Sequence, residues 1–170
     1  DVDYAEGPAA AWYPKGESPI LAQLAADGHL PPVVERVGPE PAVLKGCESI
    51  GRYGGTWLRL ATSPGDVGVI SNRMSGVTLV RWSPMGYPLK PHVARQIDIS
   101  PDRRVFTFTL RRGMRWSDGH PFTADDILYW WEADVLDLSP TSSPPSWMHV
   151  AGEPGTVEKV DDLTVRFRFP

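Results

Sequence analysis

The sequence of 170 residues contains a single cysteine, Cys47, which excludes an intramolecular disulfide and a cysteine metal cluster. Its four histidines, at positions 29, 92, 120 and 149, do not have the spacing of a zinc site. No stretch is apolar enough to span a membrane. The formal net charge is only −4, so strong attraction to nucleic acid is not expected. The sequence therefore predicts no metal site, no cofactor and no nucleic-acid partner.

Proline and tryptophan, in contrast, are abundant, with 18 and 7 residues. The prolines predict long irregular connections, and the tryptophans indicate either a heavy core or an aromatic-lined pocket. Hydrophobic residues make up 41% of the chain and charged residues 22%, which is typical of a globular protein. The length fits one domain of ordinary size.

The N-terminal region carries one clear helix pattern. Ser18 is a good N-cap, Pro19 fits the first helical position, and Gly28 can end the helix, so we expect a helix over Ser18–Asp27. Its spacing predicts a buried face made of Ile20, Leu21, Leu24 and Ala25. The four prolines of Leu30–Ala42 predict an extended or polyproline-like arm after it.

The segment Leu44–Cys47 has the residue types of a lipoprotein cleavage box. The residues before it include four prolines and no apolar run, so a signal peptide is not expected there. Because the chain begins at Asp1 and not at Met, we expect a processed protein whose export signal has been removed. This predicts a periplasmic or extracellular location, either free or anchored to the membrane through that signal.

Short strands and turns are expected between residues 51 and 91. Gly51–Gly55 predicts a tight turn, and it lacks the spacing of a phosphate-binding loop. Thr56–Leu60 and Val77–Trp82 have strand character. Ser63–Asp66 predicts a turn, and the three prolines of Ser83–Pro91 predict a loop.

Two later segments, Arg104–Leu110 and Leu163–Phe169, carry the clearest strand pattern. Both are rich in β-branched and aromatic residues. Their alternation places six apolar side chains on one face of a sheet, namely Phe106, Phe108, Leu110, Val165, Phe167 and Phe169.

A second helix is predicted from Thr123 to about Val135. The Thr123 hydroxyl and the Asp126 carboxylate are spaced for a capping box, and Phe122 and Ile127 for a hydrophobic staple. Asp125 adds favourable charge at the helix start. Proline at position 140 limits the C-terminal extent.

Candidate catalytic groups have simpler structural interpretations. Ser117–His120 contains the residue types of a hydrolase triad, but these neighbours more simply form a β-turn. We expect Arg111, Arg112 and Arg115 to stay solvated beside a strand end, and Trp131 to pack into the core.

The run Arg103–Ile127 resembles the signature of extracellular solute-binding protein family 5, which includes the oligopeptide, dipeptide and nickel binding proteins of ABC importers. The shared pattern is a strand ending in Leu-Arg, a glycine, an apolar and an aromatic residue, Asp-Gly, Pro, and Thr-Ala-Asp-Asp-Ile opening a helix. Pro91–Ala94 and Val160–Phe167 resemble further family segments, and Ser18–Ala22 and Ile50–Trp57 resemble a subgroup with an N-terminal extension.

This resemblance implies an α/β fold, namely part of the first lobe of a two-lobed periplasmic-binding-protein type II fold, a mixed sheet with helices. It implies an N-terminal extension over residues 1–50 and an incomplete first lobe over residues 51–170. The function implied is capture of a peptide, an oligosaccharide or a related solute by lobe closure, without catalysis. The partner implied is the membrane permease of an ABC importer, and we expect a monomer.

The family's ligand contacts tend to come from loops after the early strands, which makes Thr62, Ser63, Asp66 and Ser83 the candidate ligand-binding residues. Two other functions stay open: a secreted hydrolase that uses Asp118 and His120, and a structural surface module with a proline-rich arm. The sequence does not identify the solute, although flat tryptophan faces favour a sugar or another large ligand.

Overall fold

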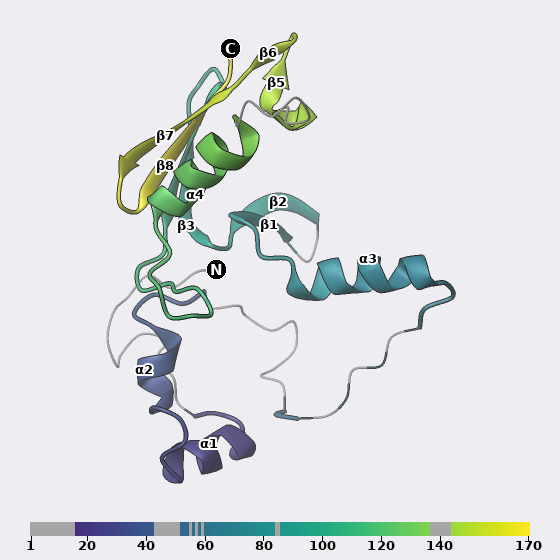
Figure 1. Ribbon diagram of the computed structural model, residues 1–170, viewed down its shortest axis with the longest axis vertical. Coiled ribbons are helices and arrows are strands. Elements are labelled where there is room, and N and C mark those ends of the chain that lie inside the picture. The colour runs from purple at the N-terminus through teal and green to yellow at the C-terminus, as the bar shows by residue number, and fades with distance from the viewer. Residues whose placement is uncertain are drawn as a thin grey trace. The chain divides into compact units, whose positions relative to one another are not determined.

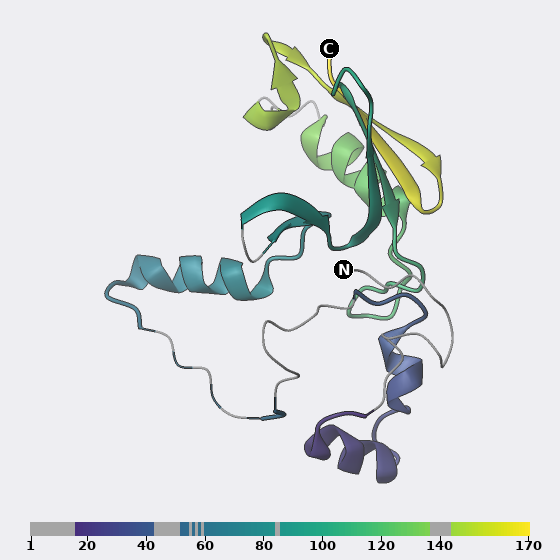
Figure 2. The ribbon, with the colours of Figure 1, turned by 180° about the vertical axis from the view of Figure 1, so that it is seen from behind.

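The computed structural model describes residues 16–42, 52–54, 56, 58, 60–83, 86–136 and 144–170. The chain separates into two compact units, Asp1–Thr78 and Leu79–Pro170, each of which is considered by itself. The described part of the first unit contains helices, and the second unit is an antiparallel sheet with a packed helix (Figures 1 and 2). Cys47, and with it the interpretation of Leu44–Cys47, lies outside the described residues. The assignment of residues 1–50 as an extension stays a prediction.

Helix α1 (Pro19–Ala26) confirms the first predicted helix. The Ser18 hydroxyl accepts a hydrogen bond from the Leu21 N–H at 3.4 Å, and Gly28 follows the helix with a φ of 75°. The predicted buried face is wrong, because Ile20, Leu21 and Leu24 are exposed. No residue of α1 is buried, and its first turn is capped by the Ser18 hydroxyl.

Helix α2 (Val33–Val37) replaces part of the extended arm that the prolines predicted. Pro32 is its N-cap, where the missing N–H costs nothing, and Gly38 ends the helix with a φ of 79°. Arg36 then ties the segment together, since its guanidinium bonds to the Pro31 carbonyl and forms an ion pair with Glu17.

Helix α3 (Pro64–Ser75) begins where the sequence predicted a turn. Proline is well suited to the first position of a helix, which is why the same residues fit both structures. The described residues of Thr56–Leu60 are not in a strand, and the side chains of Leu58 and Leu60 are 83% and 97% exposed. That strand prediction is therefore not supported.

Strands β1 (Val80–Ser83) and β2 (Gly86–Pro91) form a two-stranded antiparallel sheet. β1 confirms the later part of the second predicted strand, whereas β2 corrects the predicted proline-rich loop. Proline is tolerated in β2 because each strand of a two-stranded sheet is an edge and leaves half of its N–H groups without a strand partner. The hairpin places Trp82 opposite Leu89, with both side chains exposed.

The main sheet of the second unit has the strand order β3–β4–β8–β7, with every neighbouring pair antiparallel. Its strands are β3 (Ala94–Ile99), β4 (Val105–Leu110), β7 (Thr156–Asp161) and β8 (Thr164–Arg168). β4 and β8 confirm the two strongest predicted strands, while β3 and β7 were not predicted. A small hairpin, β5 (His149–Val150) with β6 (Glu153–Pro154), lies between α4 and β7 in the sequence.

The two faces of this sheet divide as the alternation predicted. The apolar face carries edge-to-face ring pairs, Phe106 with Phe169 at 5.7 Å and Phe108 with Phe167 at 5.5 Å between centroids. On the opposite face Arg166 bonds to the Thr107 hydroxyl and to the Glu158 carboxylate. Leu110, Val165 and Phe167 are buried, and the other three predicted apolar residues are half-buried.

Helix α4 (Ala124–Tyr129) packs on the apolar face, as both ribbon views show (Figures 1 and 2). It continues as a π-helix, η1 (Trp130–Val135), so the predicted extent to Val135 is confirmed although the π-helical winding was not expected. Together the sheet and helix enclose the core, whose buried members are Ala124, Trp131, Val135, Met148, Val157, Val165 and Phe167. The prediction that Trp131 is a core residue is therefore confirmed.

The capping box of α4 is present as predicted. The Thr123 hydroxyl accepts from the Asp125 N–H at 3.3 Å, and the Asp126 carboxylate accepts from the Thr123 N–H at 2.7 Å. The packing of Phe122 on Ile127 stays a prediction; Phe122 contacts the Trp116 ring edge-to-face at 5.2 Å.

Replacing Thr123 by Ala should lower the free energy of unfolding by about 1 kcal/mol, because the helix loses a side-chain acceptor at its first turn. Urea denaturation of the two proteins measures this difference. Asp118→Ala is the control, since Asp118 belongs to the preceding turn and its loss should cost less. An unchanged stability in the Thr123 variant would contradict the capping role.

Candidate functional site

Three of the four predicted ligand-binding residues gather at the start of α3. The Asp66 carboxylate accepts hydrogen bonds from the Thr62 N–H at 2.8 Å, the Thr62 hydroxyl at 2.8 Å and the Ser63 N–H at 3.0 Å. All three bonds reach the same oxygen, Oδ2. The arrangement is a helix cap in which the third helical residue bonds back to the residues before the helix.

These hydrogen bonds also set the protonation state of Asp66. The Thr62 hydroxyl first, and then the main-chain N–H groups of Thr62 and Ser63, hold the pKa of Asp66 below its ordinary value of 3.8. The carboxylate is therefore charged at neutral pH. Its Oδ1 atom and the hydroxyl oxygens of Thr62 and Ser63 are acceptors of the type that sugar hydroxyls and peptide N–H groups need.

The fourth predicted residue, Ser83, lies in the second unit, at the end of β1. Its hydroxyl donates to the Tyr87 carbonyl at 3.4 Å, across the β1–β2 turn. The structure thus gives all four residues a local structural role, and their role in binding stays a prediction.

The segment Ser117–His120 is an exposed turn. The Asp118 carboxylate accepts from the main-chain N–H of His120 at 2.9 Å and so closes the turn, whose Gly119 has a φ of 90°. A catalytic pair would instead need the carboxylate to orient the imidazole ring beside a nucleophile. The geometry therefore favours the β-turn interpretation over the hydrolase.

The structure corrects the prediction that Arg111 stays solvated. Arg111 is buried, with 3% of its surface exposed, and its Nε donates to the His92 carbonyl at 2.7 Å. Arg112 and Arg115 are exposed as predicted, and Arg115 bonds to the Gly119 carbonyl at 2.8 Å. Arg111 follows Leu110 at the end of β4, where its main-chain N–H donates to the Val93 carbonyl at 3.3 Å.

The turn and helix of the Arg103–Ile127 segment are held by polar side chains. Burial raises the pKa of Asp126, but hydrogen bonds from the Thr123 N–H and the Trp116 indole N–H outweigh it and lower the pKa below 3.8. Lys159 on β7 pairs with Asp125 at 2.7 Å and with Asp162 at 2.8 Å, and these contacts raise the pKa of Lys159. This segment acts as a scaffold that fixes α4 on the sheet.

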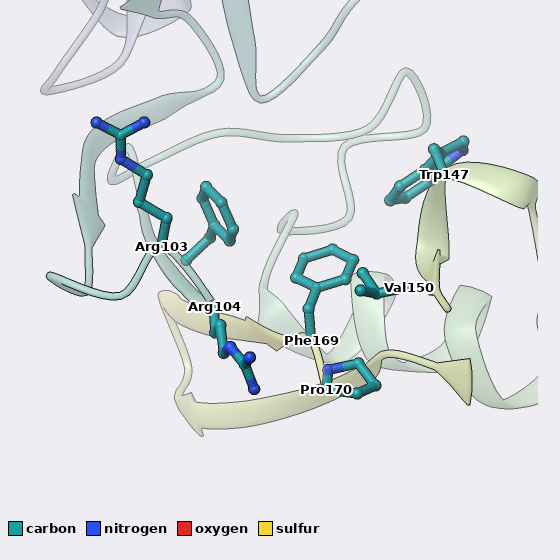
Figure 3. A pocket seen from close by; sticks show the side chains of 7 residues that line it. Arg103, Arg104, Trp147, Val150, Phe169 and Pro170 are labelled. Atoms are coloured by element: carbon teal, nitrogen blue, oxygen red, sulfur yellow. The ribbon is translucent and has the colours of Figure 1, made fainter. Parts of the chain in front are cut away.

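A pocket of about 370 Å³ opens in the second unit (Figure 3). Its lining comes from three separate stretches of the chain: Arg103, Arg104, Phe106, Trp147, Val150, Phe169 and Pro170. In Figure 3 the two arginines lie at one end and Trp147 at the other, with Phe169 and Val150 between them. The tryptophan content indicated either a heavy core or an aromatic-lined pocket, and no local pattern indicated which residues would line such a pocket.

Among the described residues, no helix is long and apolar enough to cross a membrane. Within the same residues, no group of three or more histidine, cysteine, aspartate or glutamate side chains is placed to hold a metal ion.

The Arg103–Ile127 segment lies within the part of the chain that matches a known protein family. Residues 88–170 match the family model described as bacterial extracellular solute-binding proteins, family 5 middle. This part of the chain belongs to family 5 of the bacterial extracellular solute-binding proteins. The resemblance seen in Arg103–Ile127 is therefore confirmed.

Family 5 relatives include proteins described as binding different solutes. The periplasmic alpha-galactoside-binding protein of Rhizobium meliloti is 34% identical over 163 residues, which are 84% of this chain and 23% of that protein. The periplasmic oligopeptide-binding protein OppA of Escherichia coli is 42% identical over 69 residues, 39% of this chain and 12% of that protein. The chain thus spans less than a quarter of the length of each of these relatives.

Solved structures of family 5 proteins confirm the expected fold. A structure of an oligopeptide-binding protein OppA superposes with a TM-score of 0.76 at 39% identity, covering 91% of this chain and 24% of the other. The periplasmic binding protein MelB of Agrobacterium fabrum, in complex with stachyose, gives a TM-score of 0.58 at 26% identity over 92% of this chain and 27% of the other. The chain has the fold of part of a periplasmic binding protein.

Proposed function

We propose that this protein is the extracytoplasmic solute-binding component of an ABC importer, and that it binds its solute without transforming it. The observation that carries the proposal is the Arg103–Ile127 segment, which has the family 5 sequence pattern and folds as β4, an exposed turn and the capped helix α4. Family 5 consists of solute-binding proteins, and the curated relatives named above are periplasmic.

The proposed mechanism is capture by lobe closure. Solute binds preferentially to the closed arrangement of two lobes and shifts the open–closed equilibrium toward it. The closed, loaded protein then docks on the membrane permease of the importer. We propose that it acts as a monomer in the periplasm or outside the cell.

The proposed solute is a peptide or an oligosaccharide. A peptide is supported by the likeness to OppA, and an oligosaccharide by the likeness to the alpha-galactoside-binding protein and to MelB with stachyose. Both solutes offer hydroxyl or N–H donors to acceptors such as the Asp66 carboxylate. Thr62, Ser63, Asp66 and Ser83 are the residues that we propose for contact with the solute.

Thermal unfolding of the full-length protein tests the proposed function. A solute that binds only the native state raises the melting temperature, by an amount that grows with concentration above the dissociation constant. Peptides of two to five residues and alpha-galactosides such as stachyose are the two arms, and calorimetry measures the affinity of whichever raises it. A protein that no peptide, oligosaccharide or metal complex stabilises, or one that hydrolyses its ligand, would contradict the proposal.

Replacing Asp66 by Asn should weaken solute binding by the full-length protein about tenfold or more, because a charged acceptor is worth about 1.5–3 kcal/mol in a hydrogen bond. Asn keeps an acceptor oxygen for the Thr62 and Ser63 N–H groups, so α3 should still form. Asp118→Asn, on the exposed turn of the second unit, is the matched control. Unchanged affinity in the Asp66 variant would assign Asp66 to capping alone.

A further inference from the structure

The pocket of Figure 3 is lined by none of the residues proposed for the solute. Its volume of about 370 Å³ lies at the lower end of the range of small-molecule sites, which suits a ring with a few attached atoms. The pocket combines two kinds of surface, aromatic at one end and cationic at the other.

Contacts between rings hold the aromatic side chains of the pocket in place. Trp147 lies parallel to Trp130, with an angle of 4° between the rings and 6.3 Å between their centroids. Phe106 and Phe169 support each other edge-to-face. The Trp147 side chain is nevertheless 59% exposed, so it presents apolar surface that an incoming ring can cover.

The cationic surface consists of two arginine side chains, Arg103 and Arg104. Arg103 and Arg104 are exposed, and neither guanidinium forms a hydrogen bond or ion pair with any residue that the structure describes, although the positive charge of Arg104 helps to lower the pKa of Asp102. The neighbouring acid, Asp102, is occupied by the Ser100 hydroxyl and the main-chain N–H of Arg104. The two guanidinium groups point in different directions in Figure 3, so together they give this end of the pocket a positive potential instead of forming one bidentate clamp.

The backbone of Arg103 supports a role for its side chain. Its φ is 59°, in the left-handed region that glycine occupies without cost and that other residues occupy only with strain. The turn between β3 and β4 would be better served by glycine or asparagine. A long cationic side chain at this position therefore has no explanation in the turn itself.

We propose that this pocket binds a carboxylate attached to an aromatic ring, with the ring between Trp147 and Phe169 and the carboxylate at the arginine end. A free aromatic acid and the last residue of a peptide ending in phenylalanine share this chemistry. The proposal is independent of the proposed transport function, because it uses a different set of residues.

Tryptophan fluorescence and calorimetry of the full-length protein test it with 3-phenylpropionate and with the dipeptide N-acetyl-glycyl-phenylalanine. Both should bind saturably. The ligand that binds more tightly shows whether the pocket takes a free aromatic acid or the last residue of a peptide. N-acetyl-phenylalanine amide, which lacks the charge, and N-acetyl-alanine, which lacks the ring, should each bind at least tenfold more weakly than N-acetyl-phenylalanine.

Variants locate the binding in the pocket. The double variant Arg103→Gln, Arg104→Gln and the single variant Trp147→Ala should each weaken 3-phenylpropionate binding tenfold or more. Lys90→Gln and Trp82→Ala are matched controls, because Lys90 is exposed outside the pocket and Trp82 is 65% exposed on the β1–β2 hairpin. Arg103→Gly relieves the backbone, so it should melt no earlier than the parent and still lose affinity.

Three outcomes would overturn the proposal. They are the absence of saturable binding by either carboxylate at millimolar concentration, equal binding by the acid and its amide, and equal loss of affinity in the pocket and control variants. Loss of affinity in Arg103→Gly at undiminished melting temperature would support it even where Trp147→Ala is destabilised.

Discussion

Replacing Trp131 by Ala should lower the free energy of unfolding of the second unit by about 3–5 kcal/mol. Trp131 is 4% exposed and belongs to the core between α4 and the main sheet. A buried tryptophan covers about 150–250 Å² of surface, and its removal leaves a cavity that the neighbouring rings cannot fill without leaving their own contacts. Because whole domains are stable by only about 5–15 kcal/mol, this loss is a large fraction of the total.

Urea denaturation followed by circular dichroism measures the effect. The control is Trp82→Ala, which removes the same side chain from an exposed position on the β1–β2 hairpin of the same unit and should cost far less. Equal losses in the two variants would show that Trp131 does not anchor the core.

A single added methyl group at Gly155 should have the second largest effect, a loss of about 1–3 kcal/mol or more. A Cβ atom built on Gly155 would lie 2.7 Å from the Arg168 carbonyl oxygen and 3.1 Å from the Phe169 ring. The nearest of these atoms is main chain of the sheet, so relief requires β8 to move relative to the residues before β7. Thermal unfolding of Gly155→Ala should therefore show a melting temperature at least several degrees lower.

The control for this variant is Gly68→Ala in α3. A Cβ atom at Gly68 meets nothing within 4 Å, and alanine is favoured over glycine inside a helix by about 1 kcal/mol. Gly68→Ala should leave the unfolding of the second unit unchanged. A Gly155 variant that melts with the parent would mean that this part of the chain is packed less tightly than the distances indicate.

Elements with strong local signals could be predicted from the sequence. α1 and α4 begin at residues whose side chains cap the first turn, β8 alternates apolar and polar residues over its whole length, and β4 does so from Phe106 onward. Prediction from local sequence failed where one pattern is compatible with two kinds of secondary structure. Ser63–Asp66 fits a turn and a helix start equally well, and Gly65, Gly68 and the β-branched residues of α3 weaken the helix signal.

Other elements depended on partners that local patterns do not contain. The prolines of β2 argue against a strand until β1 is known to lie on one side of it only. The hydrophobic face of α1 was predicted to be buried, yet spacing alone does not tell whether any other element covers it. The π-helical winding of η1 likewise has no local signal that we can identify.

The candidate site was less predictable than the fold for the same reason. Thr62, Ser63 and Asp66 lie within five residues, so their meeting at one carboxylate oxygen could be anticipated from capping rules. The pocket joins side chains from around residues 103, 148 and 169, which the sheet and the β5–β6 hairpin bring together. No spacing in the sequence encodes that juxtaposition.

The strand order β3–β4–β8–β7 has a consequence for the order of events during synthesis. β8 is the last of these four strands in the sequence, yet it lies between β4 and β7 and pairs with both. Until it arrives, β4 keeps an open edge, and Phe106 and Phe108 lack the ring partners Phe169 and Phe167. A chain that folded in the order of its synthesis would hold β3 and β4 as an exposed apolar hairpin, a state prone to wrong pairing, until β8 is added.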